Sequence, residues 1–368
     1  MPHRQRPVVD VIAHRAARFL GALPPFAQRL IAGSPIVIDG QQLDREAQLG
    51  LRLLRFAAGT TFEELPLHQG RDQIDTEAYI FGAEIPVHQV DSLMIPGPAG
   101  DIAARVYRGR PTEHPTAALV YLHGGGWALG NLESADAVSR FLAERAGITV
   151  ISVDYRLAPE NPFPAGLEDA LVAFEYVVAY ADQLGIDPDA VGVGGESAGG
   201  NLAAVVSLHS APGWRSPAFQ LLLNPVTDLS VKRASYQIFG TGYFLTEAQM
   251  DWYADHYLVN PEQFLDPRVS PMLTPDVSHA PPAYVMVAGF DVLRDEGQAY
   301  AHKLAQAGVE VTLRTQEGLI HGMVNATGVG HHTREVLSEV AGFLQTRHAV
   351  AIARRVRSRQ VNESKENA

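Results

Sequence analysis

The stretch VGVGGESAGG, residues 191–200, decides the fold that this sequence predicts. It consists of a small-residue apolar strand, a Gly-x-Ser-x-Gly turn and the start of a helix, which is the context that a nucleophilic serine requires. A serine at the tip of so sharp a turn takes strained backbone angles, and Gly195 and Gly199 relieve clashes with the adjoining strand and helix. The amide of Ala198 would lie at a helix N-terminus, where negative charge is favoured. Taken alone, the motif also fits a glycine-rich connection in which Ser197 is incidental.

Strands and helices alternate along the chain from about residue 90. We expect an edge hairpin over 90–107, strands at 118–122, 149–153, 190–193, 219–223, 283–288 and 310–314, and helices at 133–146, 167–184, 198–208, 296–307 and 333–346. Continuous apolar strands that alternate with helices are typical of a parallel sheet covered on both faces. The sequence therefore predicts an α/β fold with a mostly parallel central sheet and helices on both of its faces.

Two helical segments do not follow this alternation. Residues 1–90 place apolar side chains at helical spacing, and such a stripe must cover something. The aromatic-rich insertion at about 229–265 follows a strand and so falls on the active-site side of the sheet. We predict an N-terminal helical cap over 1–90, a catalytic domain over 91–347 that includes this cap insertion, and a flexible tail over 348–368. Packing of the N-terminal helices on the back of the domain is the alternative.

Composition excludes several classes of function. The 368 residues have a net charge of −12, so a nucleic acid, with its phosphate backbone, is not an expected partner. The chain has no cysteine, which excludes disulfides, thiolate metal sites and a cysteine nucleophile. Neither a secretory signal nor a bilayer-spanning apolar run is recognisable, although an organellar transit peptide is a minor alternative. We expect a cytoplasmic protein without stable membrane insertion.

The strand at 118–122 is followed by HGGGW, residues 123–127. Three successive glycines leave backbone amides bare, so a substrate oxygen can approach them closely. Amides of this loop and of Ala198 would together form an oxyanion hole with three donors. A phosphate-binding loop is the alternative, but no Lys-Ser or Lys-Thr pair follows to bind phosphate and magnesium. We expect His123 to brace the loop.

A serine hydroxyl becomes a good nucleophile when a base takes its proton and a carboxylate orients that base. Asp291 follows one expected strand and His321 follows the next, so both reach the sheet edge at which Ser197 lies. The order Ser…Asp…His is that of the α/β-hydrolase fold. The competing acids Asp295 and Glu296 are expected to begin the next helix instead, where acidic residues suit the helix dipole.

No motif in the sequence indicates a metal or a cofactor. No His-Glu-x-x-His occurs, and the pair His331-His332 has no carboxylates at ligand spacing. No Gly-x-Gly-x-x-Gly opens the first strand–helix turn. We therefore predict neither a metal site nor a cofactor.

In this order, the motifs resemble the hormone-sensitive-lipase-like esterases, a bacterial family of α/β hydrolases with an HGGG loop. The resemblance covers roughly residues 90–347. It rests on HGGGW (123–127), DYRLAPE (154–160), FPA (163–165), GESAG (195–199), DPRVSP (266–271), AGFDVLRDEG (288–297) and HGM (321–323). It implies an α/β-hydrolase fold with a helical lid built from the N-terminus and the insertion.

The resemblance also implies the roles of single residues. Ser197 would be the nucleophile, His321 the general base and acid, and Asp291 the orienting carboxylate. The oxyanion donors would be the amides of Gly124, Gly125 and Ala198, and we expect Trp127 to contact the substrate.

The sequence departs from the family's usual pattern at three positions. Glu196 stands where the elbow usually has aspartate, Val292 where proline is usual, and Met323 where an aromatic residue is usual. None of these removes a catalytic group, so they affect the expected substrate preference rather than the expected activity.

We therefore expect a serine hydrolase of short- to medium-chain acyl esters, with a small-molecule ester as its partner. Hydrolysis of an amide or formamide is the alternative within the same fold, because an acyl-enzyme can form from either bond. A non-catalytic small-molecule receptor is a further alternative, although such receptors lose the histidine that this chain keeps at 321. The sequence leaves open whether the chain forms a homodimer.

Overall fold

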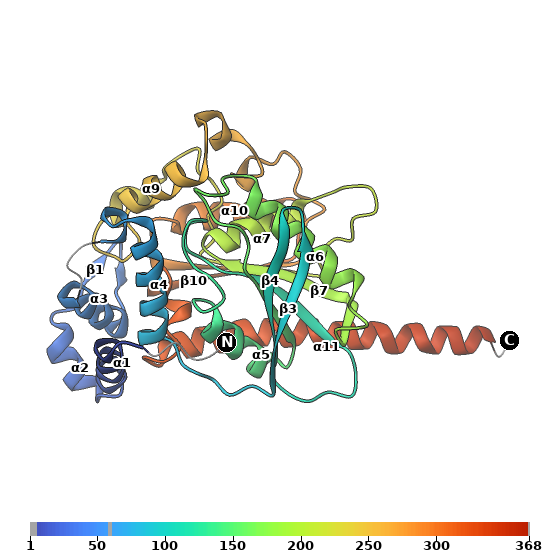
Figure 1. Ribbon diagram of the computed structural model, residues 1–368, viewed down its shortest axis with the longest axis horizontal. Coiled ribbons are helices and arrows are strands. Elements are labelled where there is room, and N and C mark those ends of the chain that lie inside the picture. Colours follow the sequence, from blue (N-terminus) through green and yellow to red (C-terminus); the bar gives the residue numbers. More distant parts are fainter. Residues whose placement is uncertain (1–5, 58–60, 367–368) are drawn as a thin grey trace.

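An eight-stranded sheet occupies the centre of the molecule, with strand order β10-β9-β8-β7-β5-β6-β4-β3 (Figure 1). The strands are β3 (Gln89–Gly97), β4 (Gly100–Arg108), β5 (Thr116–Leu122), β6 (Thr149–Val153), β7 (Ile186–Glu196), β8 (Gln220–Leu223), β9 (Ala283–Phe290) and β10 (Val311–Ile320). Pairing is antiparallel where β4 meets β3 and β6, and parallel from β6 through β10. The predicted fold class and the predicted edge hairpin are therefore confirmed.

This computed structural model describes residues 6–57 and 61–366. Residues 1–5 and 58–60 of the expected cap, and 367–368 of the expected tail, lie outside the described residues.

Both faces of the sheet are covered by helices, as the unbroken apolar run of β5 predicts. Alternate side chains of a strand point to opposite faces. Val120 and Leu122 accordingly belong to a core shared with α6, α7 and α10, whereas Leu119 and Tyr121 belong to a second core shared with α5 and α11. The bounds of these helices are α5 (Asp136–Ala146), α6 (Ala165–Ala179), α7 (Ala198–Leu208), α10 (Arg294–Gln306) and α11 (His332–Glu366).

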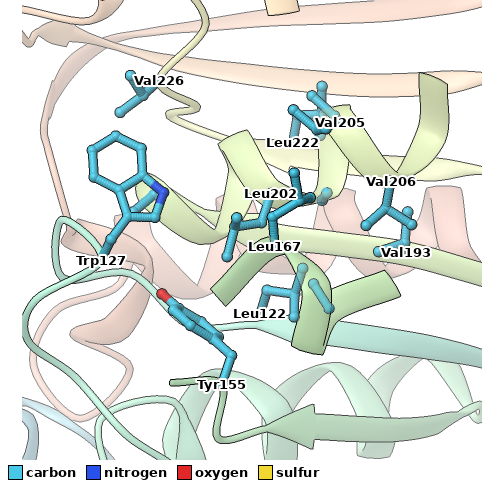
Figure 2. Close-up of a cluster of buried hydrophobic side chains, with 14 of the residues drawn as sticks. Leu122, Trp127, Tyr155, Leu167, Val193, Leu202, Val205, Val206, Leu222 and Val226 are labelled. Carbon is cyan, nitrogen blue, oxygen red and sulfur yellow. The ribbon is translucent and has the colours of Figure 1, made fainter. Parts of the chain in front are cut away.

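Figure 2 shows part of the first core around α7. Leu202 of α7 lies among Leu122 of β5, Leu167 of α6 and Leu222 of β8, all of them buried. Full burial of a side chain of this size contributes about 1.5–3 kcal/mol. This packing holds the start of α7, and with it Ser197, against the carboxyl ends of β5 and β7.

The N-terminal segment forms helices at one end of the molecule (Figure 1). Its elements are α1 (Val8–Gly21), α2 (Pro25–Ala32), a two-stranded ribbon of β1 (Val37–Ile38) and β2 (Gln41–Gln42), α3 (Arg45–Ala57), the short helix η1 (Phe62–Glu64) and α4 (Leu67–Phe81). The insertion contributes α8 (Ala234–Phe239), α9 (Glu247–Tyr257) and the short helix η2 (Pro261–Leu265). Two further short helices are η3 (Pro271–Leu273) and η4 (Met323–Asn325).

Arg71 fastens α4 to the loop that follows β5. Its guanidinium donates to the carbonyl oxygens of Ala128 (2.9 Å) and Ala158 (3.0 Å). It also binds both carboxylate oxygens of Glu160, at 2.9 and 2.7 Å, in the bidentate geometry that suits arginine. One residue thus joins an N-terminal helix to the loops that follow β5 and β6.

Two features of the termini differ from the expectation. The apolar stripe of α1 does not cover the domain, because Val8, Ile12 and Phe19 are exposed and α1 packs through small residues such as Ala17. The polar sequence after residue 347 does not end the last helix, since α11 continues to Glu366 and projects from the body in Figure 1. Helical periodicity identifies residues that share a face, but it does not determine what that face meets.

The turn at Ser197 depends on close backbone approaches. A Cβ atom on Gly195 would lie 2.4 Å from the carbonyl oxygen of Leu122 and 2.4 Å from the carbonyl carbon of Gly199. A Cβ on Gly199 would lie 2.0 Å from the oxygen of Leu122 and 2.5 Å from that of His123. Backbone atoms cannot move aside as a flexible side chain can, so only glycine fits at either position.

Gly199→Ala should therefore destabilise the protein by about 2–3 kcal/mol, as overpacking against a rigid core does. Gly342→Ala is the matched control, because Gly342 lies in α11 with nothing within 4 Å of its added Cβ. That control should stabilise the protein by up to about 1 kcal/mol, through the higher helix propensity of alanine. Denaturant unfolding measures both free energies, and equal effects of the two substitutions would contradict this packing.

Candidate active site

Ser197 is the residue between β7 and α7, and its backbone is strained, with φ 56° and ψ −120°. Its amide donates to the carbonyl oxygen of Leu223 (2.9 Å), and its own carbonyl oxygen accepts from Asn201 (3.0 Å). The buried Asn201 side chain in turn donates to the carbonyl oxygens of Val226 and Val269. These bonds over-determine the turn, so the strained conformation persists.

Asp291 and His321 are brought together at the carboxyl edge of the sheet. Asp291 directly follows β9 and His321 directly follows β10, and these are neighbouring parallel strands. Nδ1–H of His321 donates to Oδ2 of Asp291 at 2.7 Å, and both side chains are buried. The other carboxylate oxygen of Asp291 accepts the amide of Leu293 at 3.0 Å. Since Nδ1 holds the proton in this tautomer, Nε2 is left as the basic nitrogen.

The competing acids are engaged elsewhere. Glu296 is fully buried and accepts the amides of Thr227 (2.7 Å) and Asp228 (3.2 Å), and Asp295 accepts the amide of Ser235 (2.9 Å). Burial raises the pKa of Glu296 to about 8, against the lowering effect of those amides. Both acids lie in the first turn of α10, as the sequence predicted.

Glu196 places a second carboxylate at the imidazole. Its Oε1 lies 3.4 Å from Nε2 of His321 and, among the described residues, has no hydrogen-bond partner although it is buried. Its Oε2 occupies the space beside Gly124, where a Cβ atom would come within 2.0 Å of it. The sequence marked this position only as a departure from the usual aspartate, and did not predict contact with His321.

Burial and neighbouring charges have opposite effects on the pKa values of His321 and Glu196. Burial alone would lower the pKa of His321, but the carboxylates of Asp291 and Glu196 outweigh it and raise the pKa to about 9. Burial raises the pKa of Glu196 to about 7, an effect that the facing imidazole partly offsets. The protonation state of His321 therefore depends on Glu196.

Ser197 lines the same cavity as His321. In the described part of the chain, however, its hydroxyl makes no hydrogen bond with His321 or with any other group. Hydrogen bonds of this kind are often long in the absence of substrate and shorten when it binds.

The loop after β5 has the conformation that its glycines permit. Gly125 and Gly126 have φ of 113° and 58°, in the region that favours glycine. The amides of Gly124, Gly125 and Ala198 donate no hydrogen bond to any residue that the structure describes. They are therefore available to an external acceptor.

His123 supports this loop from below, as predicted. Its imidazole stacks on Tyr155 at 4.3 Å between ring centroids, and its Nδ1 donates to the carbonyl oxygen of Gly124 at 2.8 Å. The Tyr155 hydroxyl donates to the carbonyl oxygen of His123 at 2.8 Å. Burial lowers the pKa of His123 to about 4, so this imidazole is neutral at physiological pH.

Trp127 does not occupy the position that we expected. It is buried and does not belong to the cavity lining; instead it stacks flat on Tyr257 of α9, at 4.3 Å and 3°. Its φ of 59° turns the chain directly after the glycines. The ring thus holds the insertion against the glycine loop rather than contacting a substrate.

A cavity of about 420 Å³ opens over these groups. Its walls come from α1, α3, α4, the insertion, and the loops after β5, β7 and β10, and most of the lining residues are apolar. Tyr253 of α9 packs over Gly126 and lines the cavity as well. Glu77 of α4 is an exception in this apolar wall, with Gln73 as the donor to its Oε1 at 2.9 Å. Sequence reasoning gave no signal for Glu77.

Among residues 6–57 and 61–366, no group of three or more His, Cys, Asp or Glu side chains is arranged to hold a metal ion. No helix in those ranges is both long enough and apolar enough to cross a bilayer.

Residues 119–325 match a family model described as the alpha/beta hydrolase fold. A carboxylic ester hydrolase of Mycobacterium tuberculosis, LipN, is 40% identical, over 92% of this chain and 93% of the relative. The chain belongs to the hormone-sensitive-lipase-like family of α/β hydrolases. An ethyl acetate hydrolase of Pseudomonas putida is also 40% identical, over 66% of this chain and 78% of that relative.

Solved structures agree with this family membership. An ester hydrolase from the metagenome of Lake Arreo, in complex with a derivative of bipyridine phosphonate, has a TM-score of 0.80 at 38% identity. That comparison covers 83% of this chain and 98% of the other. A hyperthermophilic esterase from Pyrobaculum calidifontis has a TM-score of 0.74 at 39% identity, over 77% and 94% of the two chains.

The contact between Glu196 and His321 predicts a shift in proton affinity. Glu196→Gln removes one of the two carboxylates that raise the pKa of His321, so that pKa should fall by about one unit, as expected for loss of a charge this close. NMR titration of the His321 ring nitrogens measures it. Glu196→Asp, which keeps the charge on a shorter side chain, is the control and should retain a raised pKa. A His321 pKa unchanged in Glu196→Gln would contradict the contact.

Proposed function

We propose that this protein is a carboxylic ester hydrolase that cleaves short- to medium-chain acyl esters through an acyl-enzyme on Ser197. The observation that supports this most directly is the buried 2.7 Å hydrogen bond between His321 and Asp291, at the wall of the cavity that Ser197 lines. A carboxylate-oriented imidazole beside a serine on a strained turn is the arrangement that activates a hydroxyl.

Acylation begins when Ser197 Oγ attacks the ester carbonyl carbon and Nε2 of His321 takes the hydroxyl proton. Asp291 stabilises the resulting imidazolium through Nδ1–H and keeps the ring in place. The oxygen of the tetrahedral intermediate accepts hydrogen bonds from the free amides of Gly124, Gly125 and Ala198. The C–O bond then breaks, and the imidazolium gives its proton to the departing alcohol.

Deacylation repeats the same steps with water. His321 takes a proton from the water as it attacks the acyl carbon, and returns the proton to Ser197 Oγ as the acid leaves. Both half-reactions require Nε2 to be unprotonated at the start. Because Glu196 faces that nitrogen at 3.4 Å, its ionised form holds a proton there and opposes the reactive state.

The relatives support an ester as the substrate. Those compared above carry the names carboxylic ester hydrolase and ethyl acetate hydrolase, and a similar solved ester hydrolase binds a phosphonate derivative. The volume of the cavity favours an acyl chain of limited length, because about 420 Å³ lies at the lower end of the range for small-molecule sites. Its apolar walls suit an acyl chain.

Ser197→Ala and His321→Ala should each lower kcat for a nitrophenyl ester by about 10⁴-fold or more, since the parts of a triad act as a unit. Two matched controls should remain near the parent rate. Ser207→Ala removes a buried hydroxyl without a hydrogen-bond partner in the described chain, on the same helix α7, and His302→Ala removes an exposed histidine of α10. Near-parental hydrolysis by either triad variant would refute the proposed mechanism.

A further inference from the structure

The two helices that begin the chain turn large apolar side chains outwards. Exposed fractions are 75% for Val8, 68% for Val9, 62% for Ile12 and 67% for Phe19 on α1, and 69% for Phe26 and 80% for Leu30 on α2. We call these six residues the apolar cap surface. Single exposed apolar residues are ordinary, but six on two consecutive helices are typical of an interaction site.

The opposite sides of both helices are already engaged. The imidazole of His14 stacks on Tyr79 of α4, and its Nδ1 donates to the Tyr79 carbonyl oxygen at 2.7 Å. On α2, the buried Gln28 donates to the carbonyl oxygen of Gly21 (2.8 Å) and accepts from Arg45 (2.7 Å). Rotating either helix to bury the apolar cap surface would break these hydrogen bonds. The same bonds therefore keep the apolar cap surface facing outwards.

The apolar cap surface is accompanied by positive charge. Residues 6–32 contain four arginines and a single acidic residue, Asp10, whereas the whole chain has a net charge of −12. Arg15, Arg18 and Arg29 are exposed, and within the described ranges neither Arg15 nor Arg29 has a hydrogen bond or an ion pair. The segment that forms α1 and α2 is therefore both apolar and basic, although the whole chain is acidic.

The combination of apolar side chains and arginines favours one of two possible partners for this surface, a second copy of the chain or a lipid bilayer. A second copy of the chain would cover the apolar side chains, but it would bring the same unpaired arginines together. A bilayer that contains anionic phospholipids accepts aliphatic and aromatic side chains at the acyl boundary and pairs arginine with phosphate. Helices with apolar residues on one side and arginine beside them are typical of such interfaces.

We propose that the apolar cap surface binds the surface of an anionic phospholipid bilayer, with α1 and α2 lying in the interface and not crossing it. The opposite side of α1 contributes Ala17 and Gly21 to the wall of the cavity. Docking would therefore bring the cavity within the thickness of one helix of the lipid. This proposal concerns a surface distinct from the triad and does not depend on ester hydrolysis.

Co-sedimentation of the full chain with vesicles tests the proposal. The probes are vesicles of phosphatidylcholine alone and vesicles that also contain phosphatidylglycerol. The parent should bind the anionic vesicles at least about tenfold more strongly, and added salt should weaken that binding. The combined variant F19S/F26S/L30S should lose binding to both, whereas R15Q/R18Q/R29Q should lose only the preference for anionic vesicles.

The matched control is V259S/L265S, which removes two apolar side chains of similar exposure (65% and 66%) from the insertion and should bind as the parent does. Thermal unfolding of each variant shows that it is folded before it is compared. Parent protein that stays in the supernatant, or F19S/F26S/L30S that still sediments like the parent, overturns the proposal. So does a parent that light scattering finds dimeric and F19S/F26S/L30S monomeric without vesicle binding, which would assign the surface to a second copy.

Discussion

The backbone of Gly199 passes so close to the end of β5 that a single added carbon would lie 2.0 Å from the carbonyl oxygen of Leu122. This contact lets α7 begin directly above β5 and β7, and the rest of the site depends on it. It places Ser197 at the tip of the turn and sets the Ala198 amide beside the loop that follows β5. It also explains why the buried apolar side chains of α7 pack against the same strands that end at the site.

Once the turn is placed, the sheet supplies the remaining groups. β9 and β10 run parallel to β7, so the residues that follow them, Asp291 and His321, reach the same edge. The electrostatics of the site differ from a simple triad, however, because Glu196 brings a second carboxylate to the imidazole at 3.4 Å. A buried carboxylate that lacks a hydrogen-bond partner is costly, and protonation of either Glu196 or His321 relieves that cost. The adjacent Gly124 leaves room for this carboxylate, so the residue before Ser197 contacts the glycine loop that follows β5.

Much of this arrangement could be predicted from the sequence, because its signals are local. The glycines at 195 and 199, the three glycines after β5, and the positions of Asp291 and His321 after apolar strands each indicate a position on the sheet edge. Other features depend on which residues, or solvent, lie next to a side chain in the folded protein. The spacing of Val8, Ile12 and Phe19 indicates a common helix face but not that it points to solvent.

Trp127 and α11 illustrate the same limit. An indole after the glycine loop can point into the cavity or away from it, and its stacking partner Tyr257 lies 130 residues further along the chain. The polar sequence after residue 347 lacks a strong apolar stripe, yet it continues an existing helix and so needs no new nucleation. The contact of Glu196 with His321 joins residues that lie 125 positions apart in the chain, and the sequence around Glu196 does not indicate it.

The central claim is that His321, held by Asp291, activates Ser197 toward a carbonyl-like centre. Reaction with a fluorophosphonate, followed by mass spectrometry of the proteolytic peptides, tests this most directly. The account predicts one phosphonyl group per chain on Ser197, and labelling that is strongly slowed in His321→Ala. Labelling at another residue, or an unchanged rate of labelling in His321→Ala, would contradict it.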